Sequence, residues 1–599
     1  MKRILPCALA LVGLACSHAG KSDGGASGGT TSAATGSGGA SSTATNTGAV
    51  SGGNTGGASN PGSGGAADPG AGGTTRTGTG GATNPGSGGT TRAGTGGSTG
   101  AGGSTSGGGA TIVATGPTAK DPTTAAADLT KYYISNKGDD ANSGTSPDQA
   151  WATLGKIPKN KAIAVFFDKG SKWTITVGGT SRSGLSVSAG SVYATYGTGD
   201  KPLIQLDSSD GKTTAMAAIQ AGGNNLIDGL KVKGYATIAF PVSSNNNVIQ
   251  NCEVDGAIEG LDGGGGGTLQ LGFSISGQHN LIVGNYVHDL SGLSGDTGNV
   301  NTSGGSEAFV MNAGNNEVAY NSAVNCWVPN KTLNGAEGGC LEIIGNKANE
   351  LIENAFFHHN YCERSVGLFE ACAGNFSNDG LKIQLNHAIV RNSTVSYNVS
   401  IDAMWLYLLQ PANTDFEGLT FEHNTLIHGP ANTNIPQGGA SAFGIVYDTD
   451  VVWTTGTNPT TVPCTADADC GEKEVCLDYK GSGKACQYQF KLQPGNITVR
   501  NNMFVVLAGA DAAMMTLPPG PNDFYNNLFA PKAPMGVKTG TNGVIVAADP
   551  GLAETYHLAP TSPAVDKGSL DAQQPWADYE GHKVPCSGAP DIGAVEYCP

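Results

Sequence analysis

Short apolar runs recur from about residue 226 onwards, and most of them enclose an asparagine. In VIQNCEV, LIVGNYV and EVAYNSAV, for example, aliphatic residues stand on both sides of the Asn. Each run is too short to bury a core by itself, so copies must stack on one another, with an Asn at a shared corner. The alternative is that Asn merely favours turns. The recurring residues are Asn251, Asn285, Asn321, Asn354, Asn392, Asn424, Asn502 and Asn527, with Gly229 in the first unit.

The hydrophobic pattern contains almost no helical period. Apolar residues alternate or run in fours and fives, which is typical of strands. With 94 Gly in 599 residues and only 13% charged residues, the composition indicates a turn-rich β protein joined to a low-complexity part. Because the repeated unit keeps its sequence while its spacing varies, the pattern predicts an all-β solenoid.

The chain carries a formal net charge of −16. This charge argues against a nucleic-acid-binding surface. An acidic glycan would need a local basic patch or a bridging cation, and Ca²⁺ is the candidate ion.

The first 19 residues predict an export signal. A positive start, MKR, precedes an apolar stretch that is too short to span a bilayer. The following VGLAC resembles a bacterial lipobox, which implies acylation of Cys16 and an outer-membrane lipoprotein at the cell surface. Gly13 stands where that motif usually has Leu, so cleavage after Ala19 and free secretion are the alternative. Residues 20–118 are rich in Gly, Ser, Thr and Ala and should form a long disordered tether.

Both ends of the remaining chain carry family-like motifs. The opening motif is KYYISNKGDDANSGTSPDQAW from Lys131, and the closing motifs are DPGL, YHLAPTSPAVDKG and PDIGAVEY from Asp549, Tyr556 and Pro590. They resemble segments of secreted, pectate-lyase-like surface proteins of bacteria. The resemblance implies a single-stranded right-handed parallel β-helix over residues 130–599, with a C-terminal cap. It says little about activity.

Cysteines divide the chain further. Four of them lie in a polar stretch that explains the long step from Asn424 to Asn502, so residues 455–490 should be an insertion within the β-helix. In an exported protein they predict two disulfides of undetermined connectivity, with a zinc site as the alternative. They are Cys464, Cys470, Cys476 and Cys486, while Cys586 and Cys598 should staple the C-terminal tail. The five other core cysteines are odd in number, so at least one is free, with Cys252 as the candidate.

Counting twelve residues back from successive Asn residues aligns Phe273, Phe309 and Glu342. If the polar stretch 374–380 is a loop, Glu370 extends this row. The expected outer row is then Phe, Phe, Glu, Glu, with carboxylates ~5 Å apart on adjacent strands. That separation suits a retaining glycosidase or a Ca²⁺ site, and the rings could stack on sugars. Alternatively, both Phe residues face the core and the Glu residues are solvated or ion-paired.

A polysaccharide lyase needs a base and a means of neutralising the uronate. Lys382 and Arg364 are the available candidates, together with His358 and His359. The segment NGAE, ending at Glu337, resembles a motif of the alginate lyase and chondroitinase B family. However, that family's SxKS and RHG elements are missing, so no catalytic role can be transferred.

The sequence is compatible with three functions. The first is an envelope-tethered enzyme, a lyase or glycosidase, that acts on an acidic or neutral polysaccharide. The second is a glycan-binding adhesive protein without turnover, and the third is a structural spike. A monomer, anchored by lipid and without nucleic-acid partners, is expected in each case. The candidate catalytic residues are Glu342, Glu370, Glu337, Lys382 and Arg364, with Phe273 and Phe309 as substrate-binding residues.

Overall fold

The computed structural model describes residues 119–599 apart from short connecting segments. The export signal and the tether predicted at 1–19 and 20–118 lie outside the described residues and stay predictions, and no helix among the described residues is long and apolar enough to cross a membrane. The segments left out after residue 118 are 179–182, 212–214, 235, 257–270, 291–306, 327–338, 346–349, 366, 374–387, 402–407, 410–413, 429–443, 446–462, 471–473, 479–483, 489–495, 508–522, 533–539, 541 and 571–576.

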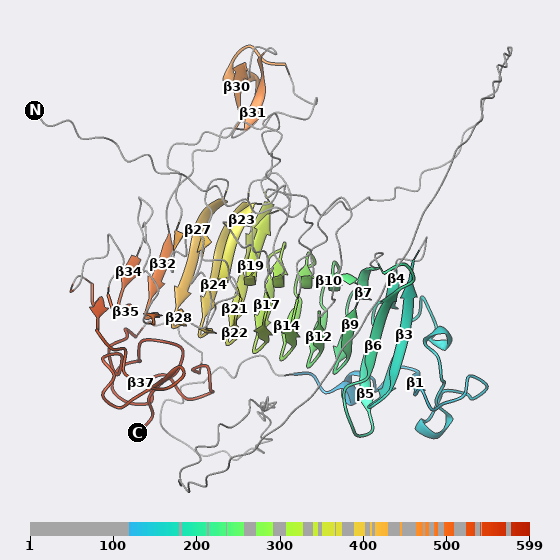
Figure 1. The fold of residues 1–599 in the computed structure, drawn as a ribbon. Helices are drawn as coiled ribbons and strands as arrows, with labels where there is room; N and C mark the ends of the chain where they lie inside the picture. The colour runs from blue at the N-terminus through green and yellow to red at the C-terminus, as the bar shows by residue number, and fades with distance from the viewer. Residues whose placement is uncertain are drawn as a thin grey trace, which may run out of the picture. The chain divides into compact units, whose positions relative to one another are not determined.

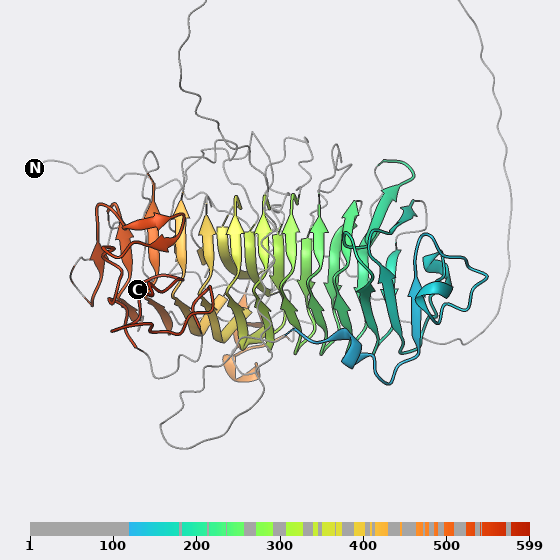
Figure 2. The same cartoon turned by 90° about the horizontal axis from the view of Figure 1, so that it is seen from below.

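The folded chain is a parallel β-helix built from three long sheets (Figures 1 and 2). It visits the sheets in turn, so that most of the described coils contribute one strand to each sheet, and all strand pairs within them are parallel. This is the predicted right-handed single-stranded solenoid, and right-handed crossovers are the rule for parallel strands.

Sheet 1 contains, in order, β1 (Lys131–Ile134), β2 (Ala164–Asp168), β5 (Val192–Tyr196), β8 (Leu226–Asp228), β11 (Val248–Gln250), β14 (Leu281–Val283), β17 (Asn316–Ala319), β21 (Ala355–His358), β24 (Ala388–Ser396), β27 (Thr414–Glu422), β32 (Ile497–Arg500) and β34 (Asp523–Tyr525), and β20 (Glu350–Glu353) pairs with β24. Sheet 2 contains β3 (Lys172–Val177), β6 (Leu203–Ser208), β9 (Lys231–Gly234), β12 (Glu253–Asp255), β15 (Tyr286–His288), β18 (Ser322–Val324), β22 (Tyr361–Glu363), β25 (Val399–Ile401), β28 (Thr425–His428), β33 (Met503–Val506), β35 (Leu528–Ala530) and β36 (Ile545–Val546). Sheet 3 contains β4 (Ser183–Val187), β7 (Ala215–Ala221), β10 (Ala236–Val242), β13 (Leu271–Ile275), β16 (Glu307–Met311), β19 (Gly339–Gly345), β23 (Gly367–Ala373), β26 (Leu408–Leu409) and β29 (Gly444–Ile445).

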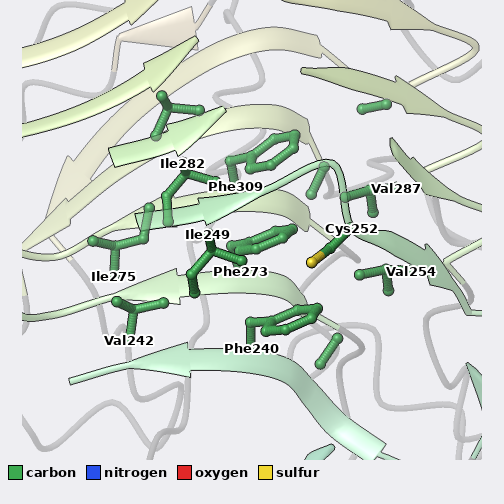
Figure 3. Close-up of a cluster of buried hydrophobic side chains, with 14 of the residues drawn as sticks. Phe240, Val242, Ile249, Cys252, Val254, Phe273, Ile275, Ile282, Val287 and Phe309 are labelled. Atoms are coloured by element: carbon green, nitrogen blue, oxygen red, sulfur yellow. The ribbon is translucent and has the colours of Figure 1, made fainter. Parts of the chain in front are cut away.

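Aromatic and aliphatic rows fill the space between the sheets (Figure 3). Phe240, Phe273 and Phe309 come from successive coils and are fully buried. Their rings stack with centroids 4.8 and 5.2 Å apart, close to the spacing of the strands that carry them. Ile249 and Ile282 of sheet 1 lie opposite these rings (Figure 3).

An asparagine ladder runs along the corner between sheets 1 and 2. Each Asn side chain donates to the side-chain oxygen of the next Asn at 2.9 to 3.1 Å, and it also accepts from a backbone N–H. This arrangement satisfies buried amides that the turn leaves without a strand partner. The members are Asn285, Asn321, Asn360, Asn398, Asn424, Asn502 and Asn527.

Three of the predicted ladder residues were therefore wrong. Asn251, Asn354 and Asn392 adopt left-handed backbone conformations, with φ of 53°, 54° and 47°, at other positions of the turns. Cys252 takes the corner beside Asn285, to which its backbone N–H donates at 2.9 Å. A second, shorter ladder was not predicted. It comprises Asn225, Asn247, Asn280 and Asn316 between sheets 3 and 1.

The residue before each ladder Asn is left-handed, and four of these residues form a stack. Tyr320, His359, Tyr397 and His423 have ring centroids 4.6, 5.3 and 4.8 Å apart. The C-terminal segment covers the stack, and His359 Nε2 donates to the carbonyl oxygen of Ala577 at 2.9 Å.

The two ends of the described chain both pack on the coils. At the N-terminal end, α1 (Pro122–Ala125), η1 (Pro147–Gln149) and η2 (Leu154–Lys156) precede the regular coils. Lys120 exchanges two 2.8 Å hydrogen bonds with the side chain of Gln250 on sheet 1. At the C-terminal end, the predicted cap includes the hairpin of β37 (Leu552–Glu554) and β38 (His557–Leu558).

The disulfides agree in part with prediction. Cys586 pairs with Cys598 as expected, and Cys464 pairs with Cys476 within the insertion. Cys470 is also disulfide-bonded. The insertion contains η4 (Asp467–Asp469) and the antiparallel hairpin of β30 (Glu474–Asp478) and β31 (Lys484–Tyr488).

The core holds one disulfide that was not predicted. Cys340 on sheet 3 is bonded to Cys362 on sheet 2, and both are fully buried. Cys252 is a buried free thiol, as predicted, and so is Cys326.

Candidate functional site

The two central carboxylates of the predicted site lie on adjacent strands. Glu342 of β19 and Glu370 of β23 are register partners in sheet 3, so their Cα positions are one strand step apart. The Glu342 side chain is fully buried, which makes a solvated outer position wrong for it. The side chain of Glu370 and all of Glu337 and Lys382 lie outside the described residues.

The predicted aromatic part of this row is wrong. Phe273 and Phe309 belong to the core stack, and Phe309 pairs with Leu341 rather than with Glu342. The register partner of Glu342 in that coil is Val310. The shift by one residue places the Phe side chains on the inner face, because alternate residues of a strand point to opposite sides. These rings are therefore not available to a sugar.

Arg364, His358 and His359 lie away from this pair of glutamates. Arg364 directly follows strand β22 of sheet 2. Both histidines are buried, and burial together with the neighbouring His358 lowers the pKa of His359 to about 3. His358 Nε2 is 2.8 Å from an oxygen of Glu317, so neither ring faces solvent as a free base.

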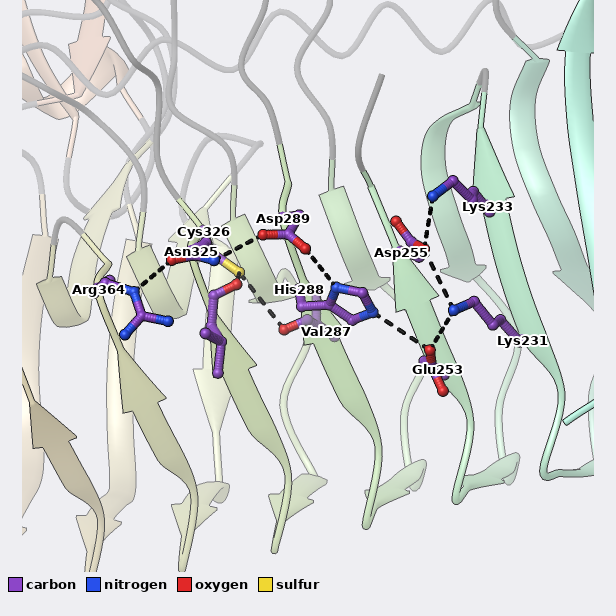
Figure 4. A network of polar contacts seen from close by, with 11 residues as sticks. Lys231, Lys233, Glu253, Asp255, Val287, His288, Asp289, Asn325, Cys326 and Arg364 are labelled. Carbon is purple, nitrogen blue, oxygen red and sulfur yellow. Dashed lines mark hydrogen bonds and ion pairs between the residues drawn. The ribbon is translucent and has the colours of Figure 1, made fainter. Parts of the chain in front are cut away.

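Polar side chains instead gather on the outer face of sheet 2, over five successive strands from β9 to β22 (Figure 4). In each strand the middle residue points into the core and the flanking residues point outward, as alternation requires. We call this surface the polar stripe. It comprises Lys201, Lys231, Lys233, Glu253, Asp255, Tyr286, His288, Asp289, Asn325, Tyr361, Glu363 and Arg364.

One end of the polar stripe is a cluster of lysines and carboxylates. Lys231 Nζ lies 2.6 Å from Glu253 and 3.3 Å from Asp255, and Lys233 Nζ lies 2.9 Å from Asp255. Lys201 approaches Glu253 at 3.8 Å. The side chains are thus held in place before any ligand arrives.

The middle of the polar stripe is built around His288. Its Nδ1 lies 2.8 Å from Asp289 and its Nε2 lies 3.4 Å from Glu253, so that the ring spans two coils. The Tyr286 ring stacks on the imidazole, with centroids 4.5 Å apart and planes inclined by 20°. Tyr286 is 37% exposed, which is unusual for a large aromatic residue and leaves one ring face open to solvent.

The other end of the polar stripe continues through left-handed turn residues. Asn325 donates to Asp289 at 2.7 Å, and Arg364 donates to Asn325 at 2.6 Å. Arg364 is also ion-paired with Glu363, which accepts a 2.9 Å hydrogen bond from Tyr361. Beyond this strand the C-terminal residues pack against sheet 2, so the open part ends there.

These contacts change the proton affinities of the stripe. The hydrogen bond to His288 and the ion pair with Lys231 outweigh burial and lower the pKa of Glu253 to about 2. For His288, burial lowers the pKa, but the bonds to Glu253 and Asp289 more than offset it, and the pKa is raised. Burial likewise opposes the effect of Lys233 and His288 on Asp255, whose pKa is lowered.

Three residues of the polar stripe lie close enough together to bind a metal cation. Ligand atoms of Asp255, His288 and Asp289 lie within 4.8 Å of one another. Two ammonium groups, those of Lys231 and Lys233, already contact the Asp255 carboxylate, so a metal ion would have to compete with them.

A signal for the polar stripe was present in the sequence but was not used. The segments KVKG, EVDG and YVHD each place a buried Val between two outward polar residues, directly after a corner. Stacking these three segments would have brought Lys231, Glu253 and His288 onto one face.

No protein-family model matches the chain, and neither does any curated protein sequence. Among solved structures, a pectate lyase is 14% identical with a TM-score of 0.37, covering 79% of this chain and 99% of its own. A rhamnogalacturonan lyase is 14% identical with a TM-score of 0.41, covering 66% and 87%. A tailspike protein of E. coli bacteriophage HK620, solved with a pentasaccharide, is 9% identical with a TM-score of 0.34, covering 67% and 63%. At these values the likenesses carry no weight for the site, which rests on this chain's own geometry.

Proposed function

We propose that this protein binds a polysaccharide along the polar stripe. The observation that carries the proposal is the exposed ring of Tyr286, which is backed by His288 and flanked by ordered charged groups. Sugar rings present apolar C–H faces that pack on aromatic rings, while their hydroxyls bond to carboxylates and ammonium groups. Because the stripe side chains are already fixed to one another, little side-chain entropy is lost on binding.

The stripe is better suited to binding than to proton transfer. Glu253, with a pKa of about 2, stays ionised at neutral pH and cannot act as a general acid. The raised pKa of His288 favours its charged form, which is not a base. Lys231 is likewise held as a cation, since its contacts with Glu253 and Asp255 overcome burial and raise its pKa.

Substitution of Tyr286 tests this function directly. Tyr286→Ala should weaken binding to the recognised glycan at least about ten-fold, which corresponds to ~1.4 kcal/mol. Leu351→Ala is the matched control, since Leu351 is 40% exposed but lies on sheet 1. Affinity electrophoresis on a panel of neutral and acidic polysaccharides, followed by calorimetry, provides the measurement. Equal affinities of both variants, or no binding to any glycan, would favour a structural spike.

A second candidate function is hydrolysis at Glu342 and Glu370. It is favoured by their pairing in register, because adjacent strands put their positions ~4.8 Å apart, near the separation used by retaining glycosidases. Reducing ends should then form with the wild-type protein and be lost in Glu370→Gln. Absorbance at 235 nm would report β-elimination instead. If the protein binds a glycan but neither reducing ends nor absorbance at 235 nm increase, it binds the glycan without cleaving it.

We further propose that the β-helix is displayed at the outer surface of the envelope as a monomer. Support comes from the export-signal pattern of residues 1–19 and from the disulfides of the described chain, which are typical of oxidising compartments. Labelling of cells with a fatty-acid analogue should mark the wild-type protein but not Cys16→Ser. The variant should also appear in the medium. Equal labelling of both proteins would contradict acylation of Cys16.

A further inference from the structure

We propose that the ligand of the polar stripe is an uncharged glycan that lies along the axis of the β-helix, across the strands of sheet 2. This inference rests on the binding function proposed above and specifies the class of ligand and its direction. It follows from the charge balance of the stripe, from the short strands of sheet 2, and from the positions of two tyrosines.

The charges of the polar stripe are paired with one another. Its three lysines and Arg364 each lie within 4 Å of one of its four carboxylates, and the one further charge, that of protonated His288, is shared between Asp289 and Glu253. The most exposed of them is Asp289, at 45% of its side chain, which would repel an anionic ligand. The chain as a whole carries −16, so there is no long-range field to attract a polyanion either. Electrostatic repulsion would therefore oppose the binding of a polyuronate, but it would not oppose the binding of a neutral glycan.

Paired charges nevertheless suit sugar hydroxyls well. A hydroxyl both donates and accepts, so it can bond to a carboxylate and to a neighbouring ammonium or guanidinium group at once. Such pairs occur at both ends of the stripe, as Lys233 with Asp255 and as Arg364 with Glu363. Arg364 and Lys233 are 42% and 36% exposed, which leaves them accessible to a ligand.

The direction of the ligand follows from the dimensions of the stripe. The central strand, Tyr286–His288, contains only three residues, so the surface is short along the strands. Across the strands it extends from β9 to β22, which is four steps of ~4.8 Å, or roughly 19 Å. Only this direction accommodates several sugar units.

Two tyrosines mark the same direction. Tyr286, Ser322 and Tyr361 are register partners on three successive strands. The tyrosine positions are thus two strand steps, or ~10 Å, apart, with a small residue between them. An extended glycan could place one ring on Tyr286, pass over Ser322 and end at Tyr361, which is only partly exposed because it packs against the C-terminal cluster around Val399. The C-terminal residues that pack on Val399 and Ile401 then close this end of the path.

Binding of neutral and acidic polysaccharides at several salt concentrations tests the charge argument. We expect wild-type protein to bind a neutral glycan with an affinity that changes less than about two-fold between 50 mM and 500 mM salt, because no counterions are released. A chelator should have no effect. The inference would be overturned by tighter binding to a polyuronate that weakens with salt or with chelation, although the proposed binding function would stand. No binding to either class would instead remove the proposed function itself.

A variant with a more positive polar stripe offers an independent check of the charge argument. Glu253→Gln with Asp289→Asn leaves the stripe net positive, so polyuronate affinity should rise at least about five-fold at low salt and fall as salt increases. His279→Asn, on an exposed residue outside the stripe, is the matched control and should change neither affinity. Unchanged polyuronate affinity in the double variant would contradict the argument.

A series of oligosaccharides tests the direction. Affinity should increase with chain length until the oligosaccharide spans roughly 19 Å, and it should then level off. Tyr361→Ala should weaken long oligosaccharides by about five-fold and leave the shortest ones unaffected, whereas Tyr286→Ala should weaken both. A plateau already reached by a disaccharide would exclude the axial path.

Discussion

Asn321 and Asn360 occupy the same corner of two consecutive coils. The backbone and side-chain N–H groups of Asn321 both donate to Oδ1 of Asn360 at 3.1 Å. Asn360 in turn donates to the carbonyl oxygen of Val318 at 2.9 Å and to Asn398 at 3.0 Å. One amide thus satisfies groups in the coil before it and the coil after it, which ties the rise of the solenoid to a hydrogen-bonded row.

Removal of one ladder residue should therefore destabilise the solenoid strongly. Asn360→Ala removes the acceptor of the backbone and side-chain N–H groups of Asn321 and the side-chain donor to the Val318 carbonyl oxygen, and each unsatisfied buried group costs about 1–3 kcal/mol. We expect a loss of at least about 3 kcal/mol in urea denaturation. Asn392→Gly is the control, because Asn392 is exposed and its φ of 47° suits glycine. Similar losses in both variants would contradict a special role for the ladder.

The fold could be predicted from sequence because the physics of one coil repeats. Runs such as LIVGNYV must bury alternate residues and turn at a polar corner, whatever the length of the loops between them. Loop length, however, decides which Asn is the corner. The coil that contains Asn354 carries the extra strand β20, so its true corner lies later, at Asn360.

The same miscount explains the error in the candidate site. Counting back from Asn354 aligned Glu342 with Phe309, whereas the strands pair Leu341 with Phe309. A shift of one residue exchanges the two faces of a strand, so the inner Phe residues were placed in the same row as the outward-pointing Glu342. The polar stripe was missed for a different reason. Outward charges are common on any sheet, and their mutual distances appear only once the coils are stacked.

The core disulfide should add to stability although it encloses few residues. Cys340 and Cys362 are separated by 22 residues, and a cross-link of this size restricts the unfolded chain by ~3 kcal/mol. The double variant Cys340→Ala with Cys362→Ala should lose about this amount in urea denaturation, and a reducing agent, which also opens the other disulfides, should lower the stability of wild-type protein by at least as much. Cys252→Ala, which removes a free buried thiol, should lose less than half as much. Insensitivity of wild-type protein to the reductant would argue against the bond.

The C-terminal cap should lose stability as the pH rises from mildly acidic values to about 8. Burial, and the nearby charges of Asp591 and Asp578, raise the pKa of Glu596 to about 8, well above its ordinary value of 4.5. The folded state therefore holds this proton more tightly than the unfolded state, and stability falls as the pH rises from about 4.5 to about 8.

Glu596→Gln tests this effect, because glutamine mimics the protonated acid. The variant should match wild-type protein near pH 4.5 and exceed its stability at pH 9 by more than about 1 kcal/mol. Thermal unfolding over this pH range is the measurement, and Glu554→Gln, on an exposed residue of β37, is the control. A constant difference between variant and wild type at every pH would show that Glu596 does not titrate in this way.

The hydrogen bonds that hold the His288 ring under Tyr286 should also depend on pH. His288 contacts Asp289 and Glu253 through its two ring nitrogens, and only the protonated ring can donate to both. Although burial opposes it, these contacts raise the pKa of His288 above 6.5. The stabilisation is complete below pH 6.5 and is lost as the pH rises through the raised pKa.

Glycan affinity should follow the same course, because the ring that stacks under Tyr286 loses one of its two bonds. We expect affinity to fall about three-fold or more between pH 6 and pH 9 in wild-type protein, and to stay constant in His288→Gln. His279→Asn should retain the wild-type profile, since His279 is exposed and lies outside the polar stripe. Calorimetric titrations at four or five pH values would measure the profile. A wild-type profile that persists in His288→Gln would assign the pH dependence to another group.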